Sequence, residues 1–300
     1  MISILVVILV LVAALLGLSV WLIHRLYRAP RVLESKSPAD FGLASREARI
    51  PTARGRRLFG WLIALDRPAP LVVIVHGWGG NAGHMLPLAP LFHHAGLHVL
   101  LIDARNHGRS DGDNFSSMPR FAEDVDHAVD WAARELGGHC GKRVLLGHSV
   151  GGGAVLLAAS RHTDIAAVIS IASFAHPADM MRRQLRAHGV PALLVGAILT
   201  YIEWVIGYRY DDIAPVHTVC RTGCPVLLVH GTHDTTVPVA DARAIHAACP
   251  DPNVELLLIE GGTHTSVARL DSRGRELLSF LARAGVIDNL PEPAAGTAPE

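Results

Sequence analysis

The stretch "RVLLGHSVGGGAVLLAAS", residues 143–160, carries the strongest structural signal in the sequence. It places Ser149 among four glycines, between an aliphatic run typical of a buried strand and an Ala/Leu-rich run typical of a helix. Residues 147–151 have the pattern G-x-S-x-G, which in this context predicts a sharp turn that lifts the serine hydroxyl clear of a sheet. Glycines on both sides leave room where a Cβ atom would collide. Ser149 is therefore a candidate nucleophile, with a plain glycine-rich turn as the alternative.

A serine nucleophile needs a base and an acid that orients the base, and with this motif the chain order is serine, acid, histidine. Asp234 follows the apolar run 225–229, and His264 follows the apolar run 254–260. Both runs have the pattern of buried strands, so both side chains are expected at strand carboxyl ends, where ligands of such sheets bind. The alternatives are a turn aspartate or helix cap for Asp234 and an ordinary loop histidine for His264.

Apolar runs and helical patterns alternate along the middle of the chain. This alternation predicts an α/β fold with a mostly parallel, doubly wound sheet. Residues 47–65 have the pattern of an antiparallel hairpin, which we expect on one edge of that sheet. The expected buried strands are residues 71–75, 98–103, 143–147, 165–173, 225–231 and 254–260.

The loop after the first of these strands resembles a dinucleotide-binding fingerprint. Residues 76–82, "HGWGGNA", contain G-x-G-x-x-A, and Asp103 ends the next strand at a distance suited to a ribose contact. Trp78 between the first two glycines counts against this interpretation, as does the hairpin that precedes the strand. A lone fingerprint of this kind is a weak indication of nucleotide binding.

The N-terminal segment differs in composition from the rest of the chain. Residues 1–23 contain no charged side chain and, as a helix, would cross about 30 Å of hydrocarbon at about 1.5 Å per residue. A cleaved signal peptide is the alternative, but no basic residue precedes the run and a poor cleavage context follows it. We predict a transmembrane anchor, with the domain in the cytoplasm because basic residues follow the span. These residues are Arg25, Arg28, Arg31 and Lys36.

Composition excludes several classes of function. The 27 basic residues balance the 27 acidic ones, so the chain has no electrostatic footprint for nucleic acid. The cysteines lack zinc-site spacing and are too few for a disulfide framework, so we expect free thiols, which agrees with a reducing compartment. They are Cys140, Cys220, Cys224 and Cys249. The histidine clusters have no carboxylate or thiolate partners that would complete a metal site.

Five motifs in a fixed order resemble the α/β-hydrolase superfamily, and more narrowly its serine aminopeptidase and monoglyceride-lipase-like branch. They are "HGWGGN", "DARNHGRSDG", "GHSVGG", "HGTHDTTVP" and "GGTH", and the resemblance covers about residues 45–285. It implies that Ser149 is the nucleophile, Asp234 the acid and His264 the base. In the second motif Asn106 stands where the family often has glycine, and asparagine tolerates positive φ better than most residues.

The resemblance also implies an oxyanion hole formed by the backbone N–H groups of Trp78 and Val150. The glycines of the "HGWGG" loop would then let the backbone approach an oxyanion rather than a pyrophosphate, which replaces the dinucleotide interpretation. No cofactor and no metal are implied.

The domain boundaries follow from these patterns. We expect an anchor over 1–23, a linker over 24–46, a hydrolase domain over 47–285 and a disordered tail over 286–300. A helical lid is expected over residues 175–215, where the alternation is interrupted. Its segment 190–208 is apolar on nearly all sides, which favours a lid helix packed on the domain. The alternatives are a lid that touches the bilayer and a second transmembrane helix.

Together these features predict a membrane-anchored serine hydrolase that cleaves carboxylic esters, including thioesters or acylglycerols, through an acyl-enzyme on Ser149. Its expected partners are a small-molecule or lipid ester and the membrane, which it would meet through the N-terminal helix. No nucleic acid and no protein partner are indicated. The alternatives are a peptidase or amidase that uses the same three residues, and a catalytically silent, anchored binding module.

Overall fold

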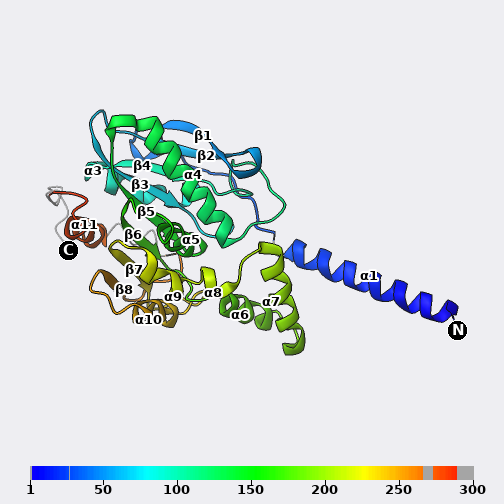
Figure 1. Ribbon diagram of the computed structural model, residues 1–300. Coiled ribbons are helices and arrows are strands. Elements are labelled where there is room, and N and C mark those ends of the chain that lie inside the picture. Colours follow the sequence, from blue (N-terminus) through cyan, green and yellow to red (C-terminus); the bar gives the residue numbers. More distant parts are fainter. Residues whose placement is uncertain (1, 27, 266–272, 289–300) are drawn as a thin grey trace.

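The computed structural model describes residues 2–26, 28–265 and 273–288. Its strands are β1 (Arg46–Thr52), β2 (Arg56–Ile63), β3 (Ala69–Val75), β4 (His98–Ile102), β5 (Cys140–His148), β6 (Ile165–Ile171), β7 (Val226–Gly231) and β8 (Val254–Ile259). They form one sheet in the order β1-β2-β4-β3-β5-β6-β7-β8. β2 pairs antiparallel with β1 and with β4, and the other described pairs are parallel. The mostly parallel sheet and the edge hairpin that the sequence predicts are confirmed (Figure 1).

The described helices include those that cover both faces of the sheet and one that projects away from it. They are α1 (Ile2–Leu26), α2 (Ala82–Met85), α3 (Ala89–His94), α4 (Met118–Leu136), α5 (Val150–Ala159), α6 (Pro177–Ala187), α7 (Ala192–Ile206), α8 (Tyr210–Ile213), α9 (Pro215–Thr218), α10 (Val239–Ala248) and α11 (Gly274–Arg283). Short 3₁₀ turns are η1 (Pro38–Phe41), η2 (Ala53–Gly55), η3 (Leu86–Leu88), η4 (Gly137–His139) and η5 (Val219–Arg221). One core lies between the sheet and α4, α5 and α10, and a second lies between the sheet and α2, α3 and α11.

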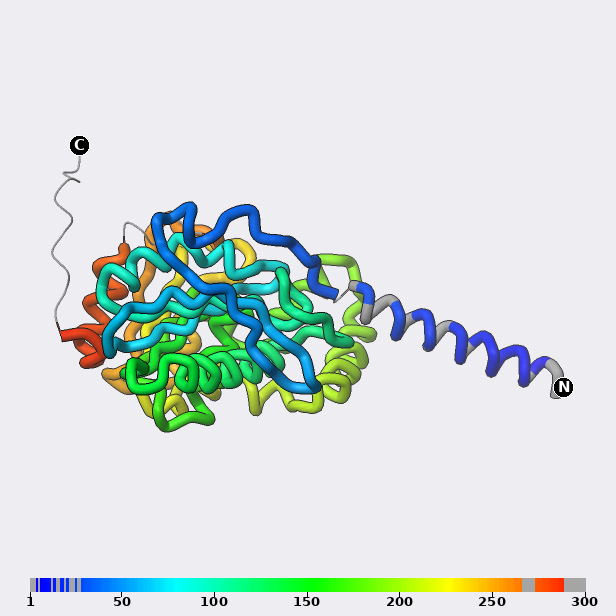
Figure 2. Tube along the Cα trace, turned by 90° about the horizontal axis from the view of Figure 1, so that it is seen from above, coloured from blue at the N-terminus to red at the C-terminus, as the bar shows by residue number. Residues whose placement is uncertain are grey.

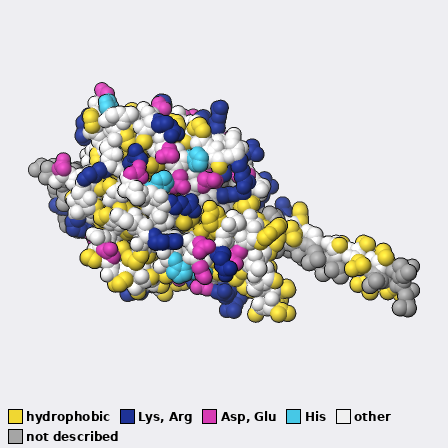
Figure 3. Space-filling model, viewed as in Figure 1, with side chains coloured by type: hydrophobic (Ala, Val, Ile, Leu, Met, Phe, Trp, Pro, Cys, Tyr) yellow, Lys and Arg dark blue, Asp and Glu magenta, His cyan; other side chains and the backbone are white. Residues whose placement is uncertain are grey.

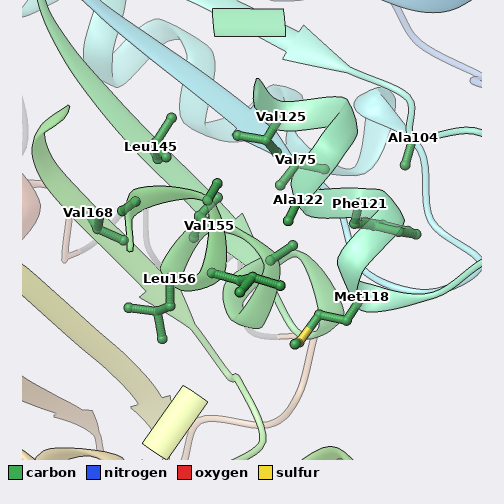
Figure 4. Packing of buried hydrophobic residues seen from close by; sticks show 14 of the residues in the cluster. Val75, Ala104, Met118, Phe121, Ala122, Val125, Leu145, Val155, Leu156 and Val168 are labelled. Carbon is green, nitrogen blue, oxygen red and sulfur yellow. The ribbon is translucent and has the colours of Figure 1, made fainter. Parts of the chain in front are cut away.

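Alternate residues of β3 enter the two cores. Val73 and Val75 pack in the core with α4 and α5, whereas Val72 and Ile74 pack in the core with α3 and α11. Figure 4 shows side chains of α4 and α5 meeting those of the strands in the first core. Since both faces are covered, the strand is apolar at every position rather than at every second one. This burial fixes the carboxyl ends of the parallel strands, from which the candidate site is built.

α1 projects away from the domain (Figures 1 and 2) and has 25 residues, about 38 Å at 1.5 Å per residue. The expected helix is present. The prediction that it spans a membrane is not supported, because no helix within the described ranges combines the length and the hydropathy that crossing a bilayer requires. The alternative of a second span fails as well, because α7 has only 15 residues.

The predicted linker, residues 24–46, is not a free connector. α1 continues into it as far as Leu26. Residues 29–34 are hydrogen-bonded to the domain, and their partners are 49 to 79 residues away in sequence. A local sequence pattern does not indicate contacts of this range. At the other end of the chain, Val286 and Ile287 are buried in the second core, so the packed domain extends past residue 285. The rest of the predicted tail, 289–300, lies outside the described residues.

Two of the four cysteines form a disulfide between Cys220 and Cys249, so the expectation of four free thiols is wrong for this pair. Cys140 and Cys224 are free, as expected. η5 packs against α10, and this tertiary contact joins two cysteines that are 29 residues apart in sequence. Because disulfides persist mainly in oxidising compartments, the cysteines no longer favour a reducing one.

Candidate active site

The chain turns sharply at Ser149, between the end of β5 and the start of α5. Ser149 has φ 55° and ψ −118°, a region that residues other than glycine rarely adopt. Its N–H donates to the carbonyl oxygen of Ile171 at 2.8 Å, which ties the turn to the end of β6. Such strain costs on the order of 1–3 kcal/mol and persists where the surroundings enforce it, commonly at functional sites.

The glycines around this turn are sterically required, as the sequence predicts. A Cβ atom on Gly147 would collide with the backbone of Gly151, and one on Gly151 would lie 2.5 Å from the carbonyl oxygen of His76. Strand β5, helix α5 and the end of β3 therefore meet at distances that only glycine permits.

Three predicted site residues come together at the carboxyl edge of the sheet. His264 Nε2 lies 3.0 Å from Ser149 Oγ, and His264 Nδ1 lies 2.7 Å from Asp234 Oδ2. Ser149 follows β5, Asp234 follows β7 and His264 follows β8. These distances are those of a nucleophile, a base and an orienting acid in hydrogen-bond contact.

Close packing of two loops aligns the acid with the base. A Cβ atom on Gly231, at the end of β7, would collide with the backbone of Gly262 in the loop after β8. The N–H of His233 donates to the carbonyl oxygen of Gly262 at 2.8 Å. The loops that carry Asp234 and His264 are thus joined through their backbones.

Asp234 is held in its ionised form. Its Oδ1 accepts the N–H groups of Thr236 and Val237 at 2.9 and 2.8 Å, and its side chain is fully buried. Although burial raises the pKa of this carboxyl, the imidazoles of His230 and His264 and the Val237 N–H hold it well below its usual value. A carboxylate at this position fixes the His264 ring with Nδ1 protonated and Nε2 free to accept a proton from Ser149.

His148 is a site residue that the sequence analysis missed. Its Nε2 lies 2.7 Å from the carbonyl oxygen of His264. Burial lowers the pKa of His148 to about 4, with a further contribution from His264, so the ring is neutral near pH 7. A neutral ring meets a carbonyl oxygen by donating its Nε2–H, and this contact holds the backbone of His264. The only sequence signal is the position of His148 directly before the nucleophile.

The loop after β3 lies directly on the nucleophile. A Cβ atom on Gly77 would lie 3.0 Å from Ser149 Cβ. Trp78 is the next residue of this loop. Val150 follows Ser149 as the first residue of α5, where helix N–H groups have no partner in the helix. Val150 thus directly follows Ser149, and Trp78 directly follows the glycine that lies against Ser149.

The dinucleotide interpretation does not fit this geometry. Asp103 is fully buried, and its carboxylate accepts the N–H groups of Ala82 and Arg109, both at 2.7 Å. It therefore joins two loops and is not available to a ribose. Asn106 has φ 69°, which confirms the expected positive φ at this position. Across the described residues, no group of three or more His, Cys, Asp or Glu side chains could hold a metal ion.

The lid, between β6 and β7, contains α6, α7, α8 and α9. A cavity of about 350 Å³ lies within it, lined by residues of α6, α7 and α8 and by His176. The three site residues Ser149, Asp234 and His264 do not line this cavity.

The sheet order and the strained turn at Ser149 are those of the α/β-hydrolase fold. The chain resembles the α/β-hydrolase superfamily, because residues 66–207 match the family model described as "Serine aminopeptidase, S33". The resemblance inferred from the five sequence motifs is thus confirmed.

Relatives support a hydrolase of the esterase and lipase type. The monoacylglycerol lipase of Mycolicibacterium smegmatis is 28% identical over 231 residues, which cover 66% of this chain and 81% of the relative. The uncharacterized protein YqkD of Bacillus subtilis is 27% identical over 219 residues, which cover 72% of this chain and 71% of the relative. The structure of the Pyrococcus furiosus esterase Pf2001 has a TM-score of 0.70 at 21% identity and covers 85% of this chain and 97% of its own, which shows a shared fold.

Proposed function

We propose that this protein hydrolyses carboxylic esters through an acyl-enzyme on Ser149. The observation that carries the proposal is the pair of hydrogen-bond contacts from His264, at 3.0 Å to Ser149 Oγ and at 2.7 Å to Asp234 Oδ2. A serine hydroxyl becomes nucleophilic when an adjacent base takes its proton, and this base has an orienting acid of its own. The likeness to a monoacylglycerol lipase supports an ester as the substrate.

In the first half of the proposed reaction, Ser149 Oγ attacks the acyl carbon of the ester and its proton passes to His264 Nε2. The backbone N–H groups of Trp78 and Val150 then donate to the oxyanion of the tetrahedral intermediate. The bond from the acyl carbon to the alcohol oxygen breaks, and the alcohol leaves with the proton from His264. Throughout this half, Asp234 stabilises the imidazolium.

In the second half, a water molecule gives a proton to His264 and attacks the acyl carbon of the acyl-enzyme. The bond between that carbon and Ser149 Oγ breaks, and His264 returns the proton to Oγ. The net reaction consumes one water and releases a carboxylic acid and an alcohol.

The lipid environment is the second part of the proposal. α1 exposes apolar side chains such as Ile4, and α7 exposes Leu193 and Trp204 by 90% and 78%. Figure 3 shows apolar side chains along α1 and at the free tip of α7, and in Figures 1 and 2 α1 leaves the domain at the end that carries α7. Soluble surfaces rarely expose apolar patches of this kind, and tryptophan suits a membrane interface. We therefore propose a lipid ester, met at a membrane surface.

The third part of the proposal is that the hydrolase domain lies on the cytoplasmic side of the membrane. Arg25, Arg28 and Lys36 lie near the end of α1 that joins the domain. Clusters of basic residues are attracted to the anionic lipids of the cytoplasmic leaflet.

A substrate panel tests the proposed reaction. Purified full-length protein would be assayed with p-nitrophenyl acyl esters and with aminoacyl p-nitroanilides, with Ser149→Ala as the control for contaminating activity. We expect hydrolysis of the esters, absent from the variant, at a kcat/KM well above that for the amides. A preference for the aminoacyl amides would instead establish a peptidase, and no turnover of either class would indicate a binding module.

A further inference from the structure

The segment after α1, residues 29–34, contacts two loops that border the candidate active site. The guanidinium of Arg31 donates through Nη1 to the carbonyl oxygens of Gly108 and Ser110, at 2.9 and 2.7 Å. In the other direction, Asn81 Nδ2 donates to the carbonyl oxygen of Val32 at 3.0 Å. The segment is therefore bonded to the loop after β3 and to the loop after β4 at once. We call it the N-terminal segment below.

The N-terminal segment also packs closely on the loop that carries Trp78. A Cβ atom on Gly79 would lie 2.9 Å from Pro30 Cγ, and one on Gly83 would lie 3.3 Å from Glu34 Cβ. Both glycines lie within five residues of Trp78. The loop thus has Ser149 on one side, against Gly77, and the N-terminal segment on the other.

A buried carboxyl pair completes this attachment. Asp103 accepts the N–H groups of Ala82, in the first loop, and of Arg109, in the second, both at 2.7 Å. Burial raises the pKa of Asp103 to about 8, and the neighbouring Glu34 carboxyl contributes to the rise. Near pH 7 Asp103 therefore holds a proton, which removes charge repulsion between it and the Glu34 carboxyl.

We infer that the N-terminal segment is a positioning element of the oxyanion hole: Arg31 holds it to the loop after β4, and through Pro30 and Glu34 it packs on the loop that presents the Trp78 N–H to the reacting oxygen. The inference rests on the ester hydrolysis proposed above. Oxyanion donors act over 2.7–3.1 Å, and a displacement of about 1 Å can lower a rate by about 100-fold. A loop of glycines needs an external support to hold such a donor still, and the N-terminal segment is the support that packs on it.

This role predicts a specific kinetic signature. An oxyanion donor interacts with the transition state far more than with the bound ester, so loosening it lowers kcat and leaves KM unchanged. Arg31→Ala removes both carbonyl contacts, and we expect kcat to fall about tenfold, less than the loss of a whole donor. Glu34→Ala is expected to act in the same direction. Glu34→Gln keeps a side-chain carbonyl oxygen that can accept the Asp103 proton, and it should recover most of that loss.

The test uses full-length protein and a short, soluble p-nitrophenyl ester. Arg221→Ala is the matched control. Like Arg31, Arg221 is exposed and donates to a backbone carbonyl oxygen, in this case that of Asp212 at 2.7 Å. This contact lies outside the loops described above. Titration with a fluorophosphonate gives the active fraction of each preparation, so a folding defect is separated from a slower enzyme. The inhibition constant of a trifluoromethyl ketone, which adds to a serine and forms an oxyanion, is measured alongside.

We expect Arg31→Ala to lower kcat and raise the inhibition constant of the ketone by the same factor, with KM unchanged and Arg221→Ala like the wild type. Unchanged kcat per active site in Arg31→Ala would overturn the inference, and so would a higher KM at constant kcat, which would place the segment in substrate binding. Wild-type protein that cleaves no ester would contradict the proposed function itself, which is a separate outcome.

Discussion

The imidazole Nε2 of His148 lies 2.7 Å from the carbonyl oxygen of His264, so the residue before the nucleophile holds the backbone of the base. The two rings are 5.0 Å apart between centroids. This contact links the turn after β5 to the loop after β8, across 116 residues of sequence. The position of the His264 ring sets the distance over which a proton moves between Ser149 and His264. His148 holds the backbone of His264, and Asp234 holds its imidazole ring.

Replacement of His148 tests that link. His148→Phe keeps a ring but removes the donor to the His264 carbonyl, and we expect kcat/KM to fall by about 10- to 100-fold because the base is less well placed. His148→Gln retains an N–H donor and should lose less. Steady-state kinetics on a soluble ester, normalised to folded protein by circular dichroism, measures both. A phenylalanine variant as active as the glutamine variant would show that the hydrogen bond has no part in positioning the base.

Replacement of the nucleophile has the largest expected effect. Ser149→Ala should lower kcat by on the order of a millionfold, by analogy with knock-outs of the nucleophile in serine hydrolases. The fold should persist, because the strained turn is enforced by the Ile171 carbonyl and the surrounding glycines rather than by the hydroxyl. Activity and thermal melting would be measured on one preparation. More than a small residual activity, once contamination is excluded, would assign the nucleophile to another residue.

The Asp103–Glu34 pair predicts a pH dependence of stability. The pKa of Asp103 is raised in the folded state, so the folded protein binds a proton that the unfolded chain has lost between about pH 4 and about pH 8. Its contribution to stability is full below this window and is lost as the pH rises through it. The other charged group beside the pair is Arg109.

The comparison is urea unfolding of wild type and Glu34→Gln at pH 5.5 and pH 8.5. Removing one carboxyl relieves part of the rise in the Asp103 pKa, so the variant should lose less stability than the wild type over this range. The buried histidines titrate in both proteins and cancel in the difference. Equal losses in the two proteins would mean that Glu34 and Asp103 are not coupled.

The apolar surface of α7 predicts a substrate-dependent defect. Trp204→Ser should leave kcat/KM on a short soluble ester unchanged and lower the rate on a long-chain ester held in vesicles. The reason is that the indole is exposed and outside the core, and on the proposed function it would contact lipid. Vesicle co-sedimentation would show weaker binding in parallel. Equal activity on vesicles in variant and wild type would contradict the lipid proposal, and an equal loss on both substrates would assign Trp204 to the fold.

The cytoplasmic proposal has a chemical test in the Cys220–Cys249 pair. A domain in the cytoplasm should carry these thiols reduced in growing cells, since glutathione and thioredoxin keep them so, and the disulfide should form after lysis in air. Rapid acid quenching followed by alkylation and mass spectrometry gives the fraction reduced. Cys140 and Cys224 serve as an internal control, because they are free in the structure. An oxidised pair in intact cells would place the domain in an oxidising compartment.

The sequence predicts those structural features that depend on a few neighbouring residues. The turn at Ser149, the loops of Asp234 and His264 and the positive φ of Asn106 are each carried by a few adjacent residues, and parallel strands bring such loops to one edge. The His148 contact, the N-terminal segment on the Gly79 loop and the Cys220–Cys249 disulfide were not predicted. Each depends on packing between distant parts of the chain, and the spacing of these residues in sequence gives no sign of it.

The central claim is that an acyl group is transferred to Ser149. Full-length protein would be mixed with a p-nitrophenyl ester, quenched in acid within milliseconds, digested and analysed by mass spectrometry. The account predicts a mass increase equal to the acyl group on the peptide that contains Ser149, formed at the rate of the p-nitrophenol burst and absent from Ser149→Ala. An acyl group on any other residue, or ester turnover with no acylated peptide under conditions where deacylation is rate-limiting, would contradict it.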